Sequence, residues 1–314
     1  MQTLPVPVMP EPETESPPVF HVSVLPEETL DALFIRPGDT VVDATVGGAG
    51  HFMRIAERLG QGGTLIGIDA DADALERARE RLRGMDASLR PSVHLVEDNF
   101  RNLGRILDRV GVRAVDRALF DLGWSGFQLA GGKGFSFQTD EPLLMTYGRP
   151  DAGNTAADIV NSMPEAELAN LIYEYGEERN SRAIARAIAA ARRSKRILTT
   201  GQLADIIARA GARGGRTNPA TKTFQALRIA VNDEFGALRE GLAAAYERLA
   251  PGGRLAVISF HSSEDRIVKQ FMKEKTAAGA VAVTRKPVAP GRAELLANRR
   301  ARSAKLRVIE KQAS

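Results

Sequence analysis

A glycine-rich turn between two periodic segments constrains the fold of this chain more than any other feature. The stretch Asp43-Ala44-Thr45-Val46-Gly47-Gly48-Ala49-Gly50-His51 follows a hydrophobic run at 40–42 and precedes an amphipathic run that starts at Phe52. This order predicts a strand, a tight turn and a helix. Glycines in the turn let the backbone approach a ligand, and the first N–H groups of the helix then point at it.

A second predicted strand, at 63–68, ends at Asp69, which lies 22 residues after Gly47. Nucleotide-binding α/β units place the acid that holds a ribose at about this distance. The Asp43 carboxylate would repel the pyrophosphate of a dinucleotide, whereas it suits the ammonium group of a methionine-like tail. The residues therefore favour S-adenosylmethionine over NAD as cofactor, with contacts at Asp43, Gly47 and Asp69. The alternative is a tight strand-to-helix turn without a ligand.

Three further strands are predicted at 92–96, 117–120 and 254–260. The pattern is that of an α/β fold with a parallel sheet, whose ligands bind beyond the carboxyl ends of the strands. The side chains expected at these ends are Asp43, Asp69, Phe100 and Asp121.

The α/β alternation breaks between residues 131 and 216, where glycine turns precede helix-like segments at 164–175, 181–193 and 200–210. We interpret 131–216 as a helical insertion on the ligand side of the sheet. A helical run from 219 to 249 follows it. The runs at 281–284 and 306–309 are expected to pair as antiparallel strands at one edge of the sheet.

The composition excludes several classes of site. The chain of 314 residues is long enough for two domains, and it has no cysteine. This absence excludes disulfides, thiolate zinc sites and the cysteine nucleophile that methylation of pyrimidine C5 uses. The four histidines, at 21, 51, 94 and 261, are too dispersed to predict a metal cluster.

Residues 1–20 contain six prolines and three glutamates, which predicts a disordered leader. No apolar stretch approaches the roughly 18 residues that a membrane span needs, and the pattern of a secretory signal is missing. We therefore expect a cytoplasmic protein with no membrane partner, either a monomer or a homodimer.

The net charge of +4 is unevenly distributed. Residues 179–196 contain seven basic side chains and no acid, and a second basic segment near the C-terminus contains Arg292, Arg299, Arg300, Arg302, Lys305, Arg307 and Lys311. Such patches are the electrostatic footprint of a nucleic-acid-binding protein. The alternative for each is a solvated helix face.

Nine segments, in order from residue 21 to the C-terminus, resemble the bacterial 16S ribosomal RNA cytosine-N4 methyltransferase family. They are His21-x-x-Val24-Leu25, DATVGGAGH, GIDAD, DNF, FDLGWSGFQL, KGFSF, TFQALRIAVNDE, FHSSEDRIVK and NRRARSAKLRV. The resemblance implies a class I, Rossmann-like methyltransferase domain formed by 21–130 and 217–314, with 131–216 as the RNA substrate domain. The implied cofactor is S-adenosylmethionine, and the implied acceptor is a cytosine in the decoding region of 16S rRNA in the small ribosomal subunit. The implied cofactor contacts are Ala49, Gly50, His51, Asp69, Phe100, Asp121 and Gln128.

The chain departs from the family pattern after its Gly-Phe-Ser-Phe segment, where Leu144 and Thr146 replace an acid and an arginine. Ala49, Gly126 and Ser263 also differ from the usual residues. We expect cofactor binding to survive these changes. The changes in the predicted substrate region are better explained by divergence within the family than by a change of the methyl acceptor.

The chemistry of amine methylation points to Asp121. The exocyclic amine of cytosine is a poor nucleophile because its lone pair is delocalised into the ring, so catalysis depends on positioning it in line with the methyl group. Acceptors for the amine protons would localise that lone pair, and Asp121 with the carbonyls of Leu122 and Gly123 is the best candidate set. Asp121 serving the cofactor alone is the alternative.

Two aromatic side chains are further catalytic candidates. Trp124 is placed to stack on an extruded base, or else it is a core aromatic. His261 follows the strand at 254–260 and could relay the proton lost after transfer, or else it caps the next helix. The acids Glu264 and Asp265 occupy first-turn positions, which acids favour regardless of function.

Three functional hypotheses remain at this point. The first is an RNA methyltransferase, and the second is a methyltransferase of the same fold with a different RNA or protein acceptor. The third is a non-catalytic, cofactor-gated RNA-binding protein, which the changes at Leu144 and Thr146 make conceivable.

Overall fold

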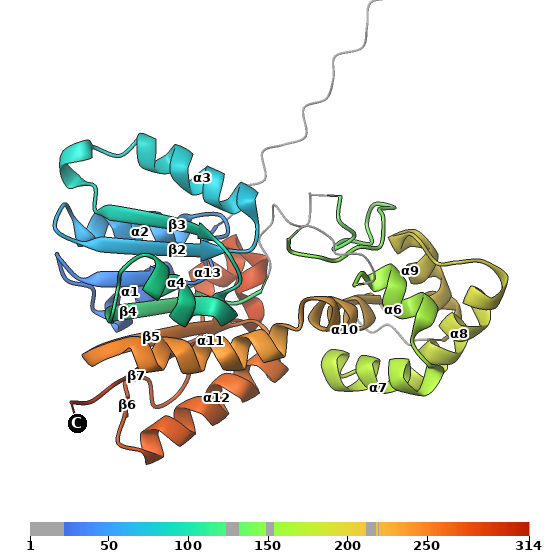
Figure 1. Cartoon of the computed structure of the whole chain (residues 1–314). Coiled ribbons are helices and arrows are strands. Elements are labelled where there is room, and N and C mark those ends of the chain that lie inside the picture. Colours follow the sequence, from blue (N-terminus) through green and yellow to red (C-terminus); the bar gives the residue numbers. More distant parts are fainter. Residues whose placement is uncertain (1–21, 124–131, 149–153, 212–217, 219, 314) are drawn as a thin grey trace, which may run out of the picture.

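The computed structural model describes residues 22–123, 132–148, 154–211, 218 and 220–313. The described chain forms a mixed sheet covered by helices, with a second body of helices beside it (Figure 1). The predicted leader, Trp124 and Gln128 lie outside the described residues.

The sheet has seven strands in the order β3-β2-β1-β4-β5-β7-β6. Their bounds are β1 Thr40–Asp43, β2 Thr64–Asp69, β3 Ser92–Glu97, β4 Val115–Asp121, β5 Leu249–Ser259, β6 Val281–Ala282 and β7 Lys305–Glu310. Strands β1 to β5 run parallel, and β7 is antiparallel to both β5 and β6. This topology confirms the predicted class I methyltransferase sheet, including its antiparallel edge. The strand order reverses between β1 and β4, and ligands of open α/β sheets bind at such a switch point.

Alternating side chains bury the two faces of the sheet against different helices. Val41 and Leu65 pack on the face covered by α1 (Pro26–Leu33), α2 (Gly50–Leu59) and α3 (Ala72–Arg83). Val42 and Ile66 pack on the other face, covered by α4 (Leu103–Arg109), α11 (Glu234–Arg248) and α12 (Ser262–Ala277). These four side chains are fully buried, and each contributes about 1.5–3 kcal/mol relative to an exposed position.

The short helices complete the sheet domain. Between β2 and β4 lie η1 (Ala87–Leu89) and η2 (Phe100–Asn102), and before β7 lie α13 (Arg292–Ala297) and η3 (Arg299–Ser303). None of the helices in the described ranges has the length and hydropathy that a membrane span requires.

The second body consists of α6 (Ala156–Ser162), α7 (Glu165–Gly176), α8 (Ser181–Ser194) and α9 (Thr200–Arg209), together with α10 (Ala220–Asn232). The three helices predicted at 164–175, 181–193 and 200–210 are confirmed. Thr199 begins α9 with a capping box, in which its side chain and that of Gln202 each accept a backbone N–H of the other residue.

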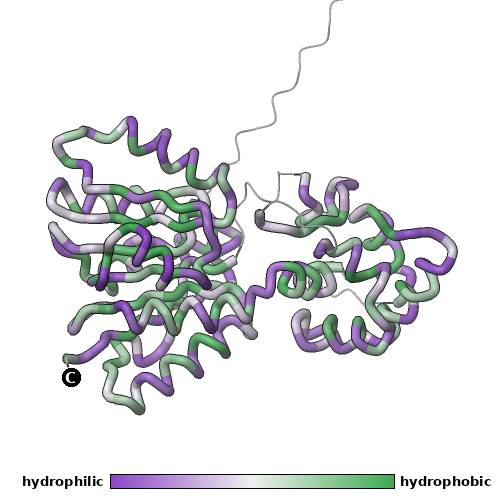
Figure 2. The backbone as a smooth tube through the Cα atoms, viewed as in Figure 1, coloured by the Kyte–Doolittle hydropathy of each residue, from purple (hydrophilic) through white to green (hydrophobic). Residues whose placement is uncertain are grey.

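The helical body has a hydrophobic core of its own, separate from the two layers of the sheet. Figure 2 shows hydrophobic residues along the strands and again among the helices of the second body. Phe224 and Leu227 of α10 belong to this core, although the sequence prediction placed residues from 217 onward with the sheet. The division into domains and the RNA-binding role of the insertion stay predictions.

The single helical run expected from 219 to 249 is instead two helices. Asp233 separates α10 from α11 and takes a φ of 44°, a left-handed conformation that interrupts a right-handed helix. Its carboxylate lies so close to Gly236 that a Cβ there would come within 2.3 Å of Oδ2. Arg101 forms an ion pair with the same carboxylate.

Gly241 of α11 is a helical position where we expect an added methyl group to be poorly tolerated. An added Cβ would lie 2.7 Å from Cδ2 of Phe100 and 3.1 Å from Cε1 of Phe120. We expect Gly241→Ala to lower the free energy of unfolding by about 1–3 kcal/mol, the usual cost of overpacking. Chemical denaturation followed by circular dichroism measures this change.

Gly104 of α4 provides the matched control, because an added Cβ there meets no atom within 4 Å. Gly104→Ala is expected to be neutral or to raise stability by up to about 1 kcal/mol, since alanine favours helices over glycine. Equal stabilities of the two variants would contradict the packing argument.

Candidate active site

A cavity of about 380 Å³ lies at the carboxyl ends of the parallel strands, next to the switch point between β1 and β4. The sheet domain and the helical body both contribute to its wall. The predicted site residues that line it are Gly47, Gly50, His51, Asp69, Phe100, Asp121 and His261. Asp43 and Ala49 are buried immediately behind this wall.

The glycine-rich turn brings the N-terminal segment close to the start of α2. Gly47 and Ala49 have φ values of 51° and 58°, in the left-handed region that glycine adopts most easily. A Cβ on Gly50 would lie 1.8 Å from Oγ of Ser23, so glycine lets the N-terminal segment rest against the helix. Gly47, Gly50 and Ser23 together form a close-fitting cradle at this end of the cavity.

Two backbone N–H groups hold the Asp69 carboxylate in place. The Gly47 N–H donates to Oδ2 at 2.8 Å, and the Asp71 N–H donates to Oδ1 at 2.9 Å. Each carboxylate oxygen can accept a further hydrogen bond, as both hydroxyls of a ribose require. Burial raises the pKa of Asp69 to about 6.

Asp43 and Asp121 are buried carboxylates on neighbouring strands. The Thr45 N–H donates to Oδ1 of Asp43 at 3.1 Å, while Oδ2 of Asp43 and Oδ1 of Asp121 accept no hydrogen bond from the described residues. His51 Nε2 lies 3.5 Å from Oδ2 of Asp121.

These environments disfavour the charged form of both acids. Burial raises the pKa of Asp43 to about 7, with a smaller contribution from the charge of Asp69. Burial, together with the charges of Asp43 and Glu264, raises the pKa of Asp121 well above its usual range. A bound cation would compensate for such burial. The site therefore fits a cofactor that carries a sulfonium and an ammonium group.

Phe100 follows β3 and forms one apolar wall of the cavity. Its ring packs edge to face on Phe120 with 5.4 Å between the ring centroids. Gly241 lies against the same two rings, which fixes the position of Phe100. A flat aromatic wall near Asp69 suits the base of an adenosine whose ribose binds that acid.

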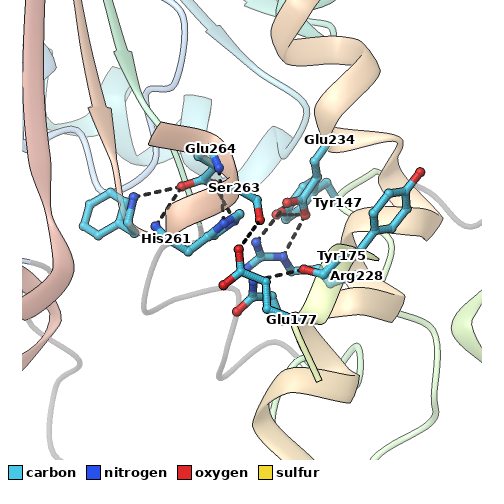
Figure 3. Close-up of polar contacts among 10 residues, drawn as sticks. Tyr147, Tyr175, Glu177, Arg228, Glu234, His261, Ser263 and Glu264 are labelled. Atoms are coloured by element: carbon cyan, nitrogen blue, oxygen red, sulfur yellow. Dashed lines mark hydrogen bonds and ion pairs between the residues drawn. The ribbon is translucent and has the colours of Figure 1, made fainter. Parts of the chain in front are cut away.

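A network at the junction of the helical body and the sheet domain forms another part of the wall (Figure 3). Arg228 of α10 donates to both carboxylate oxygens of Glu234, from Nε at 2.7 Å and from Nη2 at 2.9 Å. The Tyr147 hydroxyl donates to Oε1 of Glu234 at 2.7 Å. Sequence reasoning missed these three residues, although the TFQALRIAVNDE motif contains two of them.

His261 occupies the position between this network and β5. It begins α12 with a capping box, in which Nδ1 accepts the Glu264 N–H at 3.4 Å, and its Nε2 lies 3.1 Å from Oε1 of Glu264. The capping role that the sequence left open is present, and the residue lines the cavity as well. Burial raises the pKa of Glu264, but the contacts with His261, the Phe260 N–H and the charge of Arg228 together outweigh it and lower the pKa overall.

Donor atoms of Glu234, His261 and Glu264 lie within 4.8 Å of one another, a grouping that could in principle hold a metal ion. Both oxygens of Glu234 already bind Arg228, and Oε2 of Glu264 accepts the Phe260 N–H at 2.8 Å. The geometry is that of a hydrogen-bonded network, which the sequence did not reveal because its members come from three separate segments.

Two of the departures from the family pattern, Leu144 and Thr146, lie in a segment that backbone hydrogen bonds hold in place. The Met145 N–H donates to the Lys133 carbonyl at 2.7 Å, and the Ala156 N–H donates to the Leu144 carbonyl at 2.9 Å. Thr146 is buried, and its hydroxyl donates to the Gly148 carbonyl at 3.3 Å. Gly126 lies outside the described residues.

The two basic segments differ in their environments. On α8, Arg182, Arg193 and Lys195 are exposed, whereas Arg192 donates to the carbonyls of Val160 and Met163. In the C-terminal segment, Lys305 and Arg307 both bind Asp265, at 2.8 and 2.7 Å, and so hold α12 against β7. Arg300 lines the cavity, and Arg302 is exposed.

Replacing Asp43 with asparagine is expected to change how stability depends on pH. The folded pKa of about 7 exceeds the ordinary value of 3.8, so folding takes up a proton at Asp43 between these values. Ionised Asp43 therefore destabilises the ligand-free protein above pH 7, and this cost declines as the pH falls. We expect the stability advantage of Asp43→Asn to shrink below pH 7 with a slope of up to about 1.4 kcal/mol per pH unit.

Chemical denaturation between pH 5.5 and 8 measures this difference. Asp31→Asn is the control, because the Asp31 side chain is 73% exposed and carries no desolvation cost of this kind. An Asp43→Asn advantage that is independent of pH would contradict the assignment.

Comparison with known proteins agrees with this geometry. A profile of the MraW methylase family matches residues 18–312. The ribosomal RNA small subunit methyltransferase H of Deinococcus radiodurans is 52% identical over 303 residues, which cover 95% of this chain and 92% of that protein. The protein of the same name from Brevibacillus brevis is 48% identical over 311 residues, covering 93% of this chain and 98% of that protein.

Among solved structures, an rRNA methylase from Streptococcus thermophilus is 13% identical, with a TM-score of 0.40; the match covers 91% of this chain and 95% of that chain. The profile and the two relatives each extend over nearly the whole chain. The chain therefore belongs to the MraW methylase family.

Proposed function

We propose that this methylase transfers a methyl group from S-adenosylmethionine to the exocyclic N4 of a cytosine in the decoding region of 16S rRNA. The observation that carries the proposal is the Asp121 carboxylate, which lines the cavity at the end of β4 with 14% of its side chain exposed. The names of the relatives, which specify small-subunit ribosomal RNA, support the choice of acceptor.

The proposed cofactor site uses the residues that surround the turn. Bound S-adenosylmethionine supplies an electrophilic methyl group on a positively charged sulfur. Asp69 accepts hydrogen bonds from the ribose, and the ring of Phe100 packs against the adenine. Asp43 provides negative charge behind the glycine-rich turn, where Gly47, Ala49, Gly50 and His51 let the backbone approach the methionine portion. Gln128, implied by the family resemblance, remains part of this proposed set.

Asp121 has the geometry to activate the amine. A carboxylate oxygen of Asp121 that faces the cavity accepts an N4 proton, draws the nitrogen toward tetrahedral geometry and localises the lone pair for attack on the methyl group. The carbonyls of Leu122 and Gly123, which also line the cavity, lie next in the chain to take the second amine proton. A raised pKa suits a carboxylate that receives a proton as the amine loses one.

His261 is proposed to pass that proton onward. It lines the same cavity as Asp121, and the contact with Glu264 orients its imidazole. Trp124, which follows Gly123 directly, is proposed to stack on the extruded base.

The helical body is proposed to bind the RNA strand. Exposed Arg182, Arg193 and Lys195 on α8 supply positive charge that phosphates can neutralise. The partner is then 16S rRNA or the small ribosomal subunit, which places the enzyme in the cytoplasm.

The direct test uses immature small subunits from cells that lack this enzyme. Incubation with tritium-labelled S-adenosylmethionine, followed by nucleoside analysis, is expected to place the label in N4-methylcytidine. Label in another nucleoside or in a protein would show a different acceptor. RNA binding without label would show a non-catalytic protein.

Asp121→Asn keeps the size of the side chain and removes its charge. If the carboxylate localises the amine lone pair, the single-turnover rate of methyl transfer should fall about a hundredfold, the scale of losing one preorganised electrostatic contact. RNA affinity should be unchanged. A rate restored by saturating S-adenosylmethionine would instead assign Asp121 to cofactor binding alone.

A further inference from the structure

Arg300 is a basic residue in the wall of the cavity to which neither the family resemblance nor the proposed mechanism assigns a role. It lies in η3, is half-buried, and lines the cavity together with Ser303. Arg302, two residues further along the same 3₁₀-helix, is exposed and does not line the cavity. The two arginines therefore have different environments although they share one short element.

Hydrogen bonds fix the start of η3 beside the glycine-rich turn. The Asn298 side chain donates to the Val22 carbonyl at 3.1 Å and accepts the Arg300 N–H at 3.1 Å. The next residue after Val22 is Ser23, whose hydroxyl lies against Gly50. Asn298, Val22 and Ser23 thus connect Arg300 to Gly50, the first residue of α2.

The order of the strands places Arg300 on the side of the cavity away from Asp69. Phe100 follows β3 and Asp69 ends β2, which form one side of the sheet, whereas η3 leads into β7 beyond β5. Asp121, at the end of β4, lies between them. A cofactor whose ribose binds Asp69 and whose sulfur lies near Asp121 extends its methionine tail in the direction of η3.

Most charged side chains in the described wall of the cavity are acidic. Its described wall contains the carboxylates of Asp69, Asp98, Asp121, Glu234 and Glu264. Arg228 is paired with Glu234, whereas no carboxylate of the described residues pairs with Arg300. Burial alone lowers the pKa of its guanidinium, so this cation lacks compensation in the protein.

S-adenosylmethionine carries two cationic groups and one anionic group, the α-carboxylate at the end of its tail. The acids near β1 and β4 match the cations, and Arg300 is the cation of the wall that can match the anion. A guanidinium binds a carboxylate through two parallel hydrogen bonds. We propose that Arg300 binds the α-carboxylate of S-adenosylmethionine. The proposal rests on the cofactor placement of the proposed function.

The test is calorimetric titration of the full chain with S-adenosylmethionine and with its decarboxylated analogue, which keeps the sulfonium and the ammonium but lacks the carboxylate. We expect wild type to bind S-adenosylmethionine about tenfold or more tightly than the analogue. Arg300→Gln should lose this preference. We expect this variant to bind S-adenosylmethionine about tenfold more weakly than wild type and to bind the analogue with the affinity of wild type.

Two variants serve as controls in the same titrations. Arg302→Gln should bind both compounds as wild type does, since Arg302 is exposed. Asp69→Ala should weaken both to the same extent, because both contain the ribose, and this variant reports separately on the proposed cofactor site. The titrations contain no RNA, so their outcome does not depend on which base is the acceptor.

Two results would overturn the proposal. In the first, Arg300→Gln weakens both compounds equally, which would show that Arg300 only supports the fold of the wall. In the second, Arg300→Gln leaves both affinities unchanged while RNA affinity falls and depends less steeply on salt. That result would assign Arg300 to an RNA phosphate.

Discussion

The burial of Asp43 and Asp121 at one edge of the sheet is the constraint on which the rest of the site depends. The parallel order of β1 and β4 brings both acids to the switch point, where the cavity lies. A buried carboxylate oxygen without a hydrogen bond is costly, and its pKa rises until a proton or a cation compensates. The fold accepts this cost at the one place where a cationic cofactor can remove it.

The helical body contributes to the same cavity because side-chain contacts tie it to the sheet domain. Ser263 donates to Oε1 of Glu177 at 3.1 Å (Figure 3). Arg266 donates to the same oxygen at 3.2 Å, and the two contacts join the end of α7 to the start of α12. The Arg228–Glu234 pair spans the break between α10 and α11. These contacts hold residues of the helical body in the wall of the cavity.

Local patterns explain which parts the sequence could predict. A single sequence was enough to predict features that depend on residues near one another in the chain. These features are the hydrophobic strand runs, the spacing from Gly47 to Asp69 and the capping signal at Thr199. The break between α10 and α11 at Asp233 could not be predicted in this way. Asp233 adopts its left-handed conformation where its carboxylate contacts Arg101, which is distant in sequence, and Gly236, which carries no clear signal. The place of Arg300 in the cavity wall depends likewise on contacts between the two ends of the chain.

The structure also shows the surroundings of two residues that differ from the family pattern. Leu144 and Thr146 belong to a segment that backbone hydrogen bonds hold in place, and the Thr146 hydroxyl bonds to a carbonyl of its own segment. Neither residue lines the cavity, whereas their neighbour Tyr147 does and binds Glu234. Losing an acid and an arginine here therefore removes charge from a segment beside the cavity, and Tyr147 is the side chain of this segment that faces the cavity. This geometry is compatible with an unchanged acceptor.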